Sequence, residues 1–327
     1  MTQPGSVDRY GLTDVGRVRK SNEDQFLIAD LSKSIFIHQT SLTFDDGSRC
    51  FGGSQGSLML VADGMGGHAG GGRASTLAVD EVLLYVLYTM PWFFRFEQSA
   101  EDELKDELAA ALSKCHDSVR AESEVLPSRR GMGTTLTMAY IYWPRFYVVH
   151  VGDSRCYLLR GTQLRRITTD HTLAQEMVEA GAVEAAEAAD SRLRSALWNT
   201  IGGTSGDLTI DVHKGDLRVG DTMLLCTDGL TSHVPDDAIT KYLKDAKSAE
   251  DACNRLVSAA NEGGGSDNIT VVVASYGETE PQAVTETKVD ADEKDASRRA
   301  LPATEQEALR RGEAGIDCNP GAPSGHP

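Results

Sequence analysis

The chain of 327 residues is long enough for one large or two ordinary domains, and its 40% apolar and 25% charged residues are typical of a soluble globular protein. Its formal net charge of −17 argues against nucleic-acid binding, because an anionic surface repels a phosphate backbone. A phosphorylated substrate would meet the same repulsion, and bound cations are the obvious source of local positive charge to overcome it.

The N-terminus and the most apolar stretch bear on the location of the protein. Residues 1–9 are polar and lack the apolar core of a signal peptide. Residues 82–96, VLLYVLYTMPWFFRF, fall short of the roughly 20 apolar residues that span a bilayer, and Pro91 interrupts them. We therefore expect a buried helix followed by a loop at this stretch, no membrane association and a cytoplasmic protein.

The first half of the chain is predicted to combine two strands with two helices. A strand is expected at residues 25–30 (QFLIAD), a long polar hairpin loop at 32–56 and a second strand at 57–63 (SLMLVAD). A glycine-rich turn, GMGGHAGGG, follows, and then a helix from about Arg73. A second helix is expected at 101–124, since the acidic residues at its start suit the helix dipole.

The second half is predicted to be richer in strands. Runs of β-branched and aromatic residues between turn signals indicate strands at 134–143, 145–153, 155–161, 208–217, 222–228 and 268–276. Composition predicts helices at 170–189, 236–247 and 249–261, with an irregular stretch at 191–206. Because helices and strands occur in blocks, the pattern predicts an α+β fold with mostly antiparallel sheets.

The composition changes after Tyr276. Residues 278–327 are polar and acidic, contain five of the ten prolines and have few large apolar residues. Such a segment cannot bury a core, so we expect a disordered tail. Deleting it is expected to leave catalysis intact.

Acidic residues recur at the ends of the predicted strands. A lone Asp-Gly or Ser-Asp-Asn is usually a turn, but five such sites in order are hard to obtain by chance. The sites are LMLVADG at Asp63, YVVHVGD at Asp153, MLLCTDG at Asp228, SDNITVVVAS at Asp267 and the pair Glu23–Asp24 before QFLIAD.

Such a pattern favours a metal site. A carboxylate at the end of a buried strand is held rigidly yet opens towards solvent, and an adjacent glycine lets a ligand approach the backbone closely. Several carboxylates that converge at one sheet end repel each other unless cations lie between them. Ligation by oxygen alone selects Mg²⁺ or Mn²⁺ over zinc, and Mg²⁺ keeps waters that can act as the nucleophile.

Six ordered segments carry a resemblance to a known family. They are VGRVRKSNEDQF, LVADGMGGHAGG, GMGTTLTMAY, VVHVGDSRCYLLR, LLCTDGLTSHV and GGSDNITVVV. Together they resemble the motifs of the protein phosphatase 2C (PPM) family in its bacterial form, over residues 8–276. The resemblance implies a β-sandwich of two antiparallel sheets flanked by helices (α-β-β-α), with a dinuclear metal site at one end and a variable flap at about 170–206. Residues 277–327 would form the tail outside this catalytic domain.

The resemblance also implies roles for the principal metal ligands. Two Mg²⁺ or Mn²⁺ ions would be bridged by Asp63, and Gly64 would give its backbone carbonyl to one of them. Asp228 and Asp267 would complete the coordination of the other. These ions would activate a bridging water that attacks phosphorus in line, so no phospho-enzyme is needed.

Four further residues receive roles from the same resemblance. Glu23 and Asp24 would act mainly through metal-bound waters, and Asp153 would support a third, weaker ion. Arg19 matches the arginine that grips the phosphate, a role that suits a guanidinium because it can bond two phosphate oxygens at once. Outside this motif, Arg19 would be interpreted as an exposed loop charge.

Two positions depart from the family pattern. Met65 stands where some members have a histidine proposed as the general acid, which leaves a metal-bound water as the alternative acid; nearby His68 is interpreted as a loop residue. Ser232 stands where the family often has aspartate, which weakens the case for a tight third ion. Cys226 lacks the Cys-x5-Arg loop of a cysteine phosphatase and is interpreted as a packing residue.

The sequence therefore predicts a phosphoserine/phosphothreonine protein phosphatase that opposes a bacterial Ser/Thr kinase. The alternatives are a pseudophosphatase used as a scaffold and a hydrolase of small phosphoesters. The presence of Asp63, Asp228 and Asp267 favours an enzyme over a scaffold. In the flap, Arg192 and Arg194 could contact a phosphosubstrate, although a solvated surface is the ordinary interpretation of such charges.

Overall fold

The computed structural model describes residues 6–36, 49–66, 70–88, 98–184, 187, 192–203 and 208–277. All of them belong to one structural unit, Met1–Pro281. The predicted tail, His68 and the segment 89–97 lie outside the described residues.

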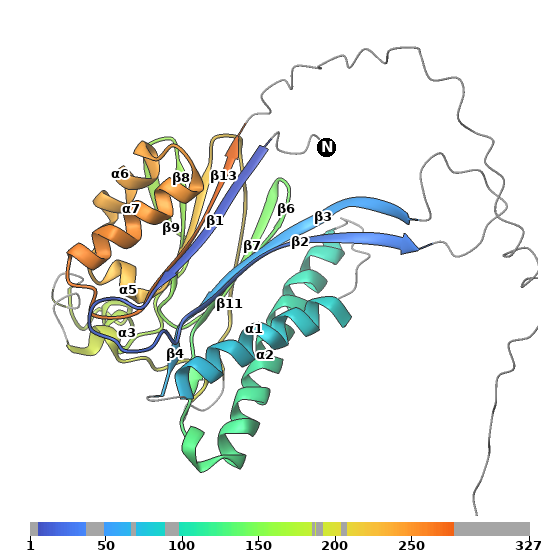
Figure 1. Cartoon of the computed structure of the whole chain (residues 1–327). Helices are drawn as coiled ribbons and strands as arrows, with labels where there is room; N and C mark the ends of the chain where they lie inside the picture. The colour runs from blue at the N-terminus through green and yellow to red at the C-terminus, as the bar shows by residue number, and fades with distance from the viewer. Residues whose placement is uncertain are drawn as a thin grey trace, which may run out of the picture. The chain divides into compact units, whose positions relative to one another are not determined.

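Two five-stranded antiparallel sheets form the centre of the molecule (Figure 1). The first has the order β1 (Ser6–Asp14), β13 (Ile269–Gly277), β12 (Thr222–Cys226), β8 (Arg155–Arg160), β9 (Gln163–Arg166). The second has the order β11 (Asp211–Asp216), β7 (Arg145–Val151), β6 (Leu136–Tyr142), β3 (Arg49–Ala62), β2 (Gln25–Phe36). A small third sheet joins β10 (Ile201–Gly202), β5 (Gly133–Thr134) and β4 (Gly64–Met65).

The inner strands are apolar on both faces because both faces are covered. Along β3, Met59 and Val61 pack into the core between the two sheets. Leu58, Leu60 and Ala62 alternate with them and pack against the helices. This two-residue period explains why SLMLVA reads as a continuous apolar run.

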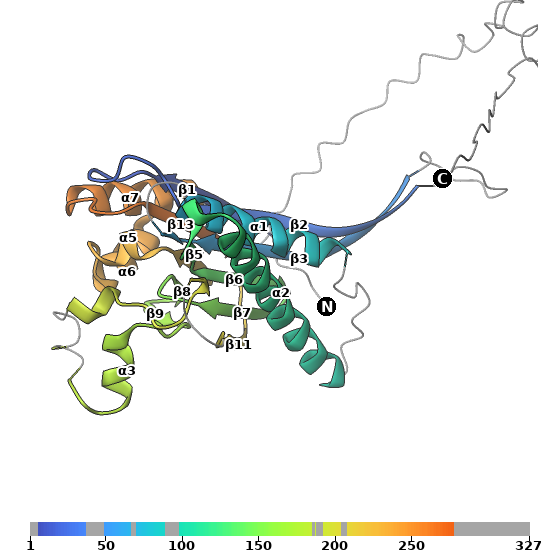
Figure 2. The ribbon, with the colours of Figure 1, turned by 90° about the horizontal axis from the view of Figure 1, so that it is seen from below.

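Helices cover the outer faces of the sandwich (Figures 1 and 2). The second sheet packs against α1 (Gly70–Tyr88) and α2 (Gln98–Val125), and the first against α6 (Asp236–Asp245) and α7 (Ala249–Glu262). Shorter elements are the 3₁₀ turns η1 (Pro127–Arg129) and η2 (Arg192–Ser195) and the helices α3 (Leu173–Glu179) and α5 (Asp228–Thr231). The predicted α-β-β-α sandwich is confirmed.

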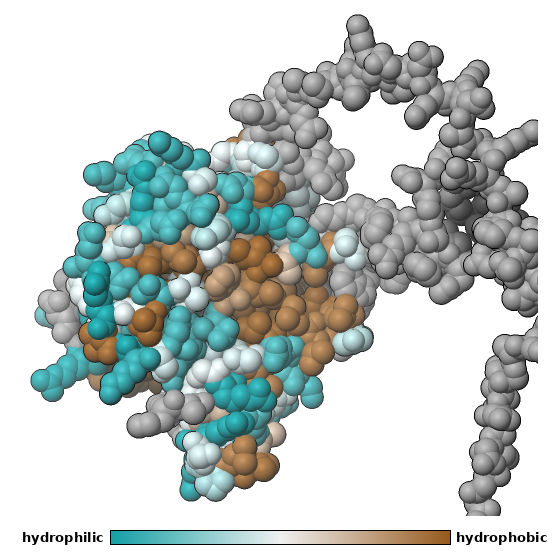
Figure 3. All heavy atoms as spheres, viewed as in Figure 1, coloured by the Kyte–Doolittle hydropathy of each residue, from teal (hydrophilic) through white to brown (hydrophobic). Residues whose placement is uncertain are grey.

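The apolar run 82–96 begins in the C-terminal half of α1. Val82 and Val86 are buried, but Leu84, Leu87 and Tyr88 are exposed, so the expectation of a buried helix is right for one face only. Figure 3 shows apolar residues gathered on the side that carries β2, β3 and α1, whereas the side of α6 and α7 is hydrophilic. Within the described residues, no helix combines the length and apolar character needed to cross a bilayer.

Three other expectations need correction. Residues 6–14 form β1, which was not predicted, because its charged residues hide the alternation of an edge strand. The β2–β3 hairpin has longer strands than predicted, extending to Phe36 and from Arg49. The helix expected at 170–189 begins only at Leu173 and is interrupted after α3 at Gly181, where a positive φ of 67° favours glycine; residue 187 is helical again.

Candidate metal centre and adjoining groove

Five aspartates lie next to the ends of different central strands. They are Asp24 before β2, Asp63 after β3, Asp153 after β7, Asp228 after β12 and Asp267 before β13. The antiparallel pairing places the start of β2 beside the end of β3, and the start of β13 beside the end of β12. All five therefore converge at one end of the sandwich, and we call them the carboxylate cluster.

The carboxylate cluster is a concentration of buried negative charge. Burial, followed by the neighbouring carboxylates, raises the pKa of Asp63 well above its ordinary value. Burial likewise raises the pKa of Asp24 to about 7 and raises the pKa values of Asp153 and Asp228. Burying these carboxylates close together is favourable only if protons or cations lie among them.

Asp24 is anchored through one of its two carboxylate oxygens. Its Oδ2 accepts hydrogen bonds from Thr227 Oγ1 at 2.9 Å and Thr270 Oγ1 at 2.7 Å. The N–H of Thr270 donates to Thr227 Oγ1 at 3.0 Å within the first sheet, and the bonds of both threonines to Asp24 connect this sheet to the second one below the cluster. Sequence reasoning missed both threonines, because their partner is more than 200 residues away along the chain.

The chemistry of the cluster fits hard divalent cations. Within the described residues, Asp24 Oδ1 and Asp228 Oδ1 are buried carboxylate oxygens without a hydrogen-bond partner. All candidate donors are oxygens, the type that Mg²⁺ and Mn²⁺ prefer. With the side chains in their present positions, the described residues contain no group of three His, Cys, Asp or Glu side chains close enough to hold an ion. The fit therefore rests on the donor type and the two unpartnered oxygens.

Asp267 is held by protein groups in this structure. Arg19 Nη2 donates to Asp267 Oδ2 at 2.7 Å, and the N–H of Asn268 donates to Asp267 Oδ1 at 2.8 Å. The bond to Asp267 is also the main cause of the raised pKa of Arg19. The predicted phosphate-binding arginine thus contacts a predicted metal ligand, a pairing that the sequence did not predict.

Asn268 fixes the loop that carries Arg19 and Glu23. Its Oδ1 accepts from the N–H of Glu23 at 2.9 Å, and its Nδ2 donates to the carbonyls of Val15 and Ser21, both at 3.0 Å. Sequence reasoning noticed Asn268 only as part of a turn signature. Its position directly after a functional aspartate was the available signal.

Glycines around the cluster allow segments to approach each other. A Cβ on Gly64 would lie 2.3 Å from the carbonyl oxygen of Gly71, and a Cβ on Gly71 would lie 2.5 Å from Glu23 Oε2. A Cβ on Gly229 would lie 1.9 Å from the carbonyl oxygen of Asn268. The glycines beside Asp63 and Asp228 are therefore required by close packing of protein segments, in addition to any ligand.

The turn that carries Asp153 is fastened to the start of the flap by His171. The N–H of Gly152 donates to His171 Nδ1 at 3.1 Å, and the N–H of His171 donates to the carbonyl of Gly152 at 2.7 Å. His171 Nε2 lies 3.2 Å from Asp211 Oδ2 on β11, which lowers the pKa of Asp211. His171 thus ties the Asp153 turn to β11.

Asn199 fastens the far end of the flap to the same histidine. Its Nδ2 lies 2.7 Å from His171 Nδ1, and it exchanges hydrogen bonds with the backbone N–H and carbonyl of Thr209. We call His171 and Asn199 the flap clasp. Sequence reasoning identified neither residue.

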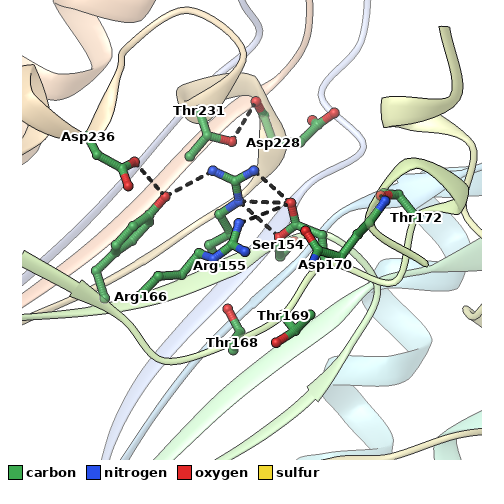
Figure 4. A network of polar contacts seen from close by, with 12 residues as sticks. Ser154, Arg155, Arg166, Thr168, Thr169, Asp170, Thr172, Asp228, Thr231 and Asp236 are labelled. Carbon is green, nitrogen blue, oxygen red and sulfur yellow. Dashed lines mark hydrogen bonds and ion pairs between the residues drawn. The ribbon is translucent and has the colours of Figure 1, made fainter. Parts of the chain in front are cut away.

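A groove of about 430 Å³ opens beside the cluster, between the flap and the segment that joins α5 to α6. Asp153 and Asp228 line one part of it, and residues of α3 and η2 line another. Asp170 accepts three hydrogen bonds from Arg155, at 2.6, 2.9 and 3.1 Å, and Arg166 lies 3.5 Å from the same carboxylate. Figure 4 shows both arginines directed at Asp170, close to Asp228.

Cys226 has no part in this site. It is fully buried in β12, as predicted, and burial raises the pKa of its thiol to about 12. A thiolate nucleophile is therefore excluded at neutral pH.

Comparison with known proteins agrees with this geometry. The sequence profile of the family described as Protein phosphatase 2C matches residues 38–270. The chain belongs to the protein phosphatase 2C family. Metal dependence is a general property of this family.

Two bacterial relatives place the chain within the family. The serine/threonine protein phosphatase PstP of Mycobacterium tuberculosis is 38% identical over 229 residues, which cover 68% of this chain and 42% of PstP. This chain thus matches less than half the length of that relative. The serine/threonine phosphatase stp of Listeria monocytogenes is 30% identical over 261 residues, which cover 80% of this chain and 92% of that protein.

A solved protein phosphatase 2C structure bears on the metal centre. The catalytic domain of the serine/threonine protein phosphatase PstP in complex with two manganese ions superposes with a TM-score of 0.63 and 30% identity. The match covers 83% of this chain and 99% of that domain.

Proposed function

We propose that this chain is a metal-dependent serine/threonine protein phosphatase whose carboxylate cluster holds two Mg²⁺ or Mn²⁺ ions. The observation that carries the proposal is the cluster itself, with its raised pKa values and the unpartnered oxygens of Asp24 and Asp228. Divalent cations would remove the repulsion that these carboxylates otherwise suffer. The two manganese ions in the related PstP domain support the same assignment.

The proposed ligands follow the family motif. Asp63 would bridge the two ions, the carbonyl of Gly64 would bind one of them, and Asp228 and Asp267 would bind the other. For Asp267 to do so, its contact with Arg19 would have to loosen. Releasing Arg19 in this way would free its guanidinium for the phosphate group.

Other residues of the cluster have supporting roles. Glu23 and Asp24 would bind waters of the ions, with Asp24 held in place by Thr227 and Thr270. Asp153 would support a third, weaker ion, for which Ser232 provides no carboxylate. The roles of all these residues, and the third ion itself, remain predictions.

The chain's own groups would position the substrate for hydrolysis. The bound ions supply a Lewis acid and a means to activate water for attack on phosphorus. Arg19, whose side chain is 54% exposed, would bind two oxygens of the phosphate and offset the charge on them in the transition state. Met65 offers no proton, so no side chain at that position protonates the leaving alcohol.

The test is phosphate release from a phosphothreonine peptide with Mn²⁺ added, with and without a chelator. We expect turnover that is lost with the chelator and in Asp228→Asn. Asp237→Asn is the matched control, since Asp237 is an exposed residue at the start of α6 outside the groove. No turnover by folded protein with Mn²⁺ present would favour a scaffold, and faster hydrolysis of small phosphoesters than of peptides would favour the third alternative.

The biological setting is part of the same proposal. The substrates would be phosphoproteins made by a Ser/Thr kinase that this enzyme opposes. The catalytic domain at 8–276, the flap at 170–206, the cytoplasmic location and the absence of nucleic-acid binding remain predictions from the sequence.

A further inference from the structure

The groove beside the carboxylate cluster has features of a peptide-binding site. Its volume of about 430 Å³ lies within the range of roughly 300–1,000 Å³ that ligand sites occupy, and it reaches Asp153 and Asp228. A phosphate group held at the cluster would place the flanking residues of its peptide in this groove. We propose that the groove binds these flanking residues and that Arg194 selects acidic ones, an inference that rests on the proposed phosphatase function.

The charges that line the groove are unequally engaged. Arg155 makes three hydrogen bonds to Asp170 and one to the hydroxyl of Tyr157, so its donors serve the protein. Arg166 shares the same Asp170 at 3.5 Å. Arg194 is exposed on η2 and makes no hydrogen bond or ion pair with any described residue. Arg194 is therefore the lining cation that a ligand can recruit without breaking an existing pair.

Outside the cluster the groove is lined by three arginines and two aspartates, so one positive charge is in excess, and Arg194 is the arginine that has no partner among the described residues. Asp170 is neutralised by two arginines. Asp236 accepts a hydrogen bond from the Tyr157 hydroxyl and begins α6, where the helix dipole stabilises a negative charge. Asp153 and Asp228 belong to the cluster that the proposed ions neutralise. An acidic peptide residue would thus gain an ion pair, whereas a basic one would face Arg194.

The remaining lining suits an extended peptide. Val178 and Ala174 of α3 and Val234 and Pro235 beyond α5 provide apolar surface. Gln175 and Ser195 provide hydrogen-bonding side chains on the flap side. The rest of the lining is polar or charged, which suits the backbone and polar side chains of a peptide better than an apolar ligand.

The test compares two phosphoserine peptides and their non-hydrolysable phosphonate analogues, which differ only in glutamates or lysines beside the phosphorylated residue. Binding of the labelled analogues is measured by fluorescence anisotropy with Mn²⁺ present, and turnover is measured on the phosphopeptides. Wild-type protein is expected to bind the glutamate peptide about two to five times more tightly, the range of an exposed ion pair. Arg194→Glu is expected to abolish or reverse this ratio.

Arg192→Glu is the matched control, because Arg192 lies on the same turn with the same charge but does not line the groove. It is expected to keep the wild-type ratio. Equal binding of the two analogues by wild type, or the same change in both variants, would overturn the inference. Charge-selective binding without turnover of either phosphopeptide would instead sink the phosphatase proposal and leave the groove assignment standing.

Discussion

The carboxylate cluster and the flap clasp lie next to each other but are held in opposite ways. The cluster is positioned by the register of central strands, and its side chains repel one another, so its pKa values are raised. The clasp is positioned by its own hydrogen bonds, which join Gly152, Thr209 and Asp211 around His171 and Asn199. Substitutions should therefore affect function in the cluster and stability in the clasp.

The largest effect is expected for Asp63→Asn. Loss of the proposed bridging carboxylate should lower turnover of a phosphothreonine peptide by about 10³-fold or more. The same substitution should raise the free energy of unfolding in chelator by about 1 kcal/mol at pH 7. The sign follows from the raised pKa of Asp63: the folded state binds the proton more tightly, so its stability falls as pH rises above the unfolded pKa.

Turnover and urea unfolding of the same preparation would measure both quantities. Asp237→Asn is the control: it should leave turnover unchanged and lower the free energy of unfolding slightly, because Asp237 lies in the first turn of α6. A loss of both activity and stability would break the comparison, because it would mean that Asp63 is structurally supportive without ions.

For His171→Ala we expect a loss of stability and only a small loss of turnover, the opposite of the pattern expected for Asp63→Asn. It would leave the N–H of Gly152 and groups of Asn199 and Asp211 without their partner, at a cost of about 2–4 kcal/mol in the free energy of unfolding. Turnover per folded molecule should fall far less than in Asp63→Asn. Urea unfolding and turnover again separate the two effects.

His213→Ala provides the control for this clasp variant. His213 lies on β11 near Asp211, but its buried Nε2 has no hydrogen-bond partner among the described residues. Its removal should cost less than that of His171. Equal costs would show that packing, and not the hydrogen bonds of the clasp, accounts for the effect.

The comparison also shows what the sequence could predict of the fold. Strand segments buried on both faces, such as the C-terminal part of β3 and most of β12, are visible as uninterrupted apolar runs. The edge strand β1 is not, because Asp8 and Arg9 obscure its pattern while its pairing with β13 holds it in place. The helix predicted at 170–189 is interrupted after α3, since helix propensity is weak evidence without a face to bury.

The same limit applies to the candidate site. The convergence of aspartates could be predicted, because each stands beside a glycine or next to a recognisable strand. The residues that hold them could not, since Thr227, Asn268 and His171 bond to partners that are distant in sequence. Only tertiary structure brings these groups together, and of the three residues only Asn268 carried a local signal, its position directly after Asp267.

The smallest effect is expected for the pH dependence of stability at His150, a buried histidine beside the flap clasp. This buried side chain lies 2.8 Å from the Thr137 hydroxyl and 3.0 Å from the carbonyl of Thr169, and its ring packs on His171. Burial and the neighbouring His171 lower its pKa from 6.5 to about 3, although Asp170 and Asp211 act in the opposite direction. The folded protein therefore holds His150 neutral.

Between about pH 6.5 and 3 the unfolded chain binds one more proton at this position, so the stability that His150 contributes is lost as pH falls. The limiting slope is about 1.4 kcal/mol per pH unit. Urea unfolding of wild type and His150→Asn from pH 7.5 to 5 should show a steeper loss in wild type, while shifts from other groups cancel in the difference. Parallel curves would mean that His150 can take up a proton in the folded state, and its surroundings would then be open to water.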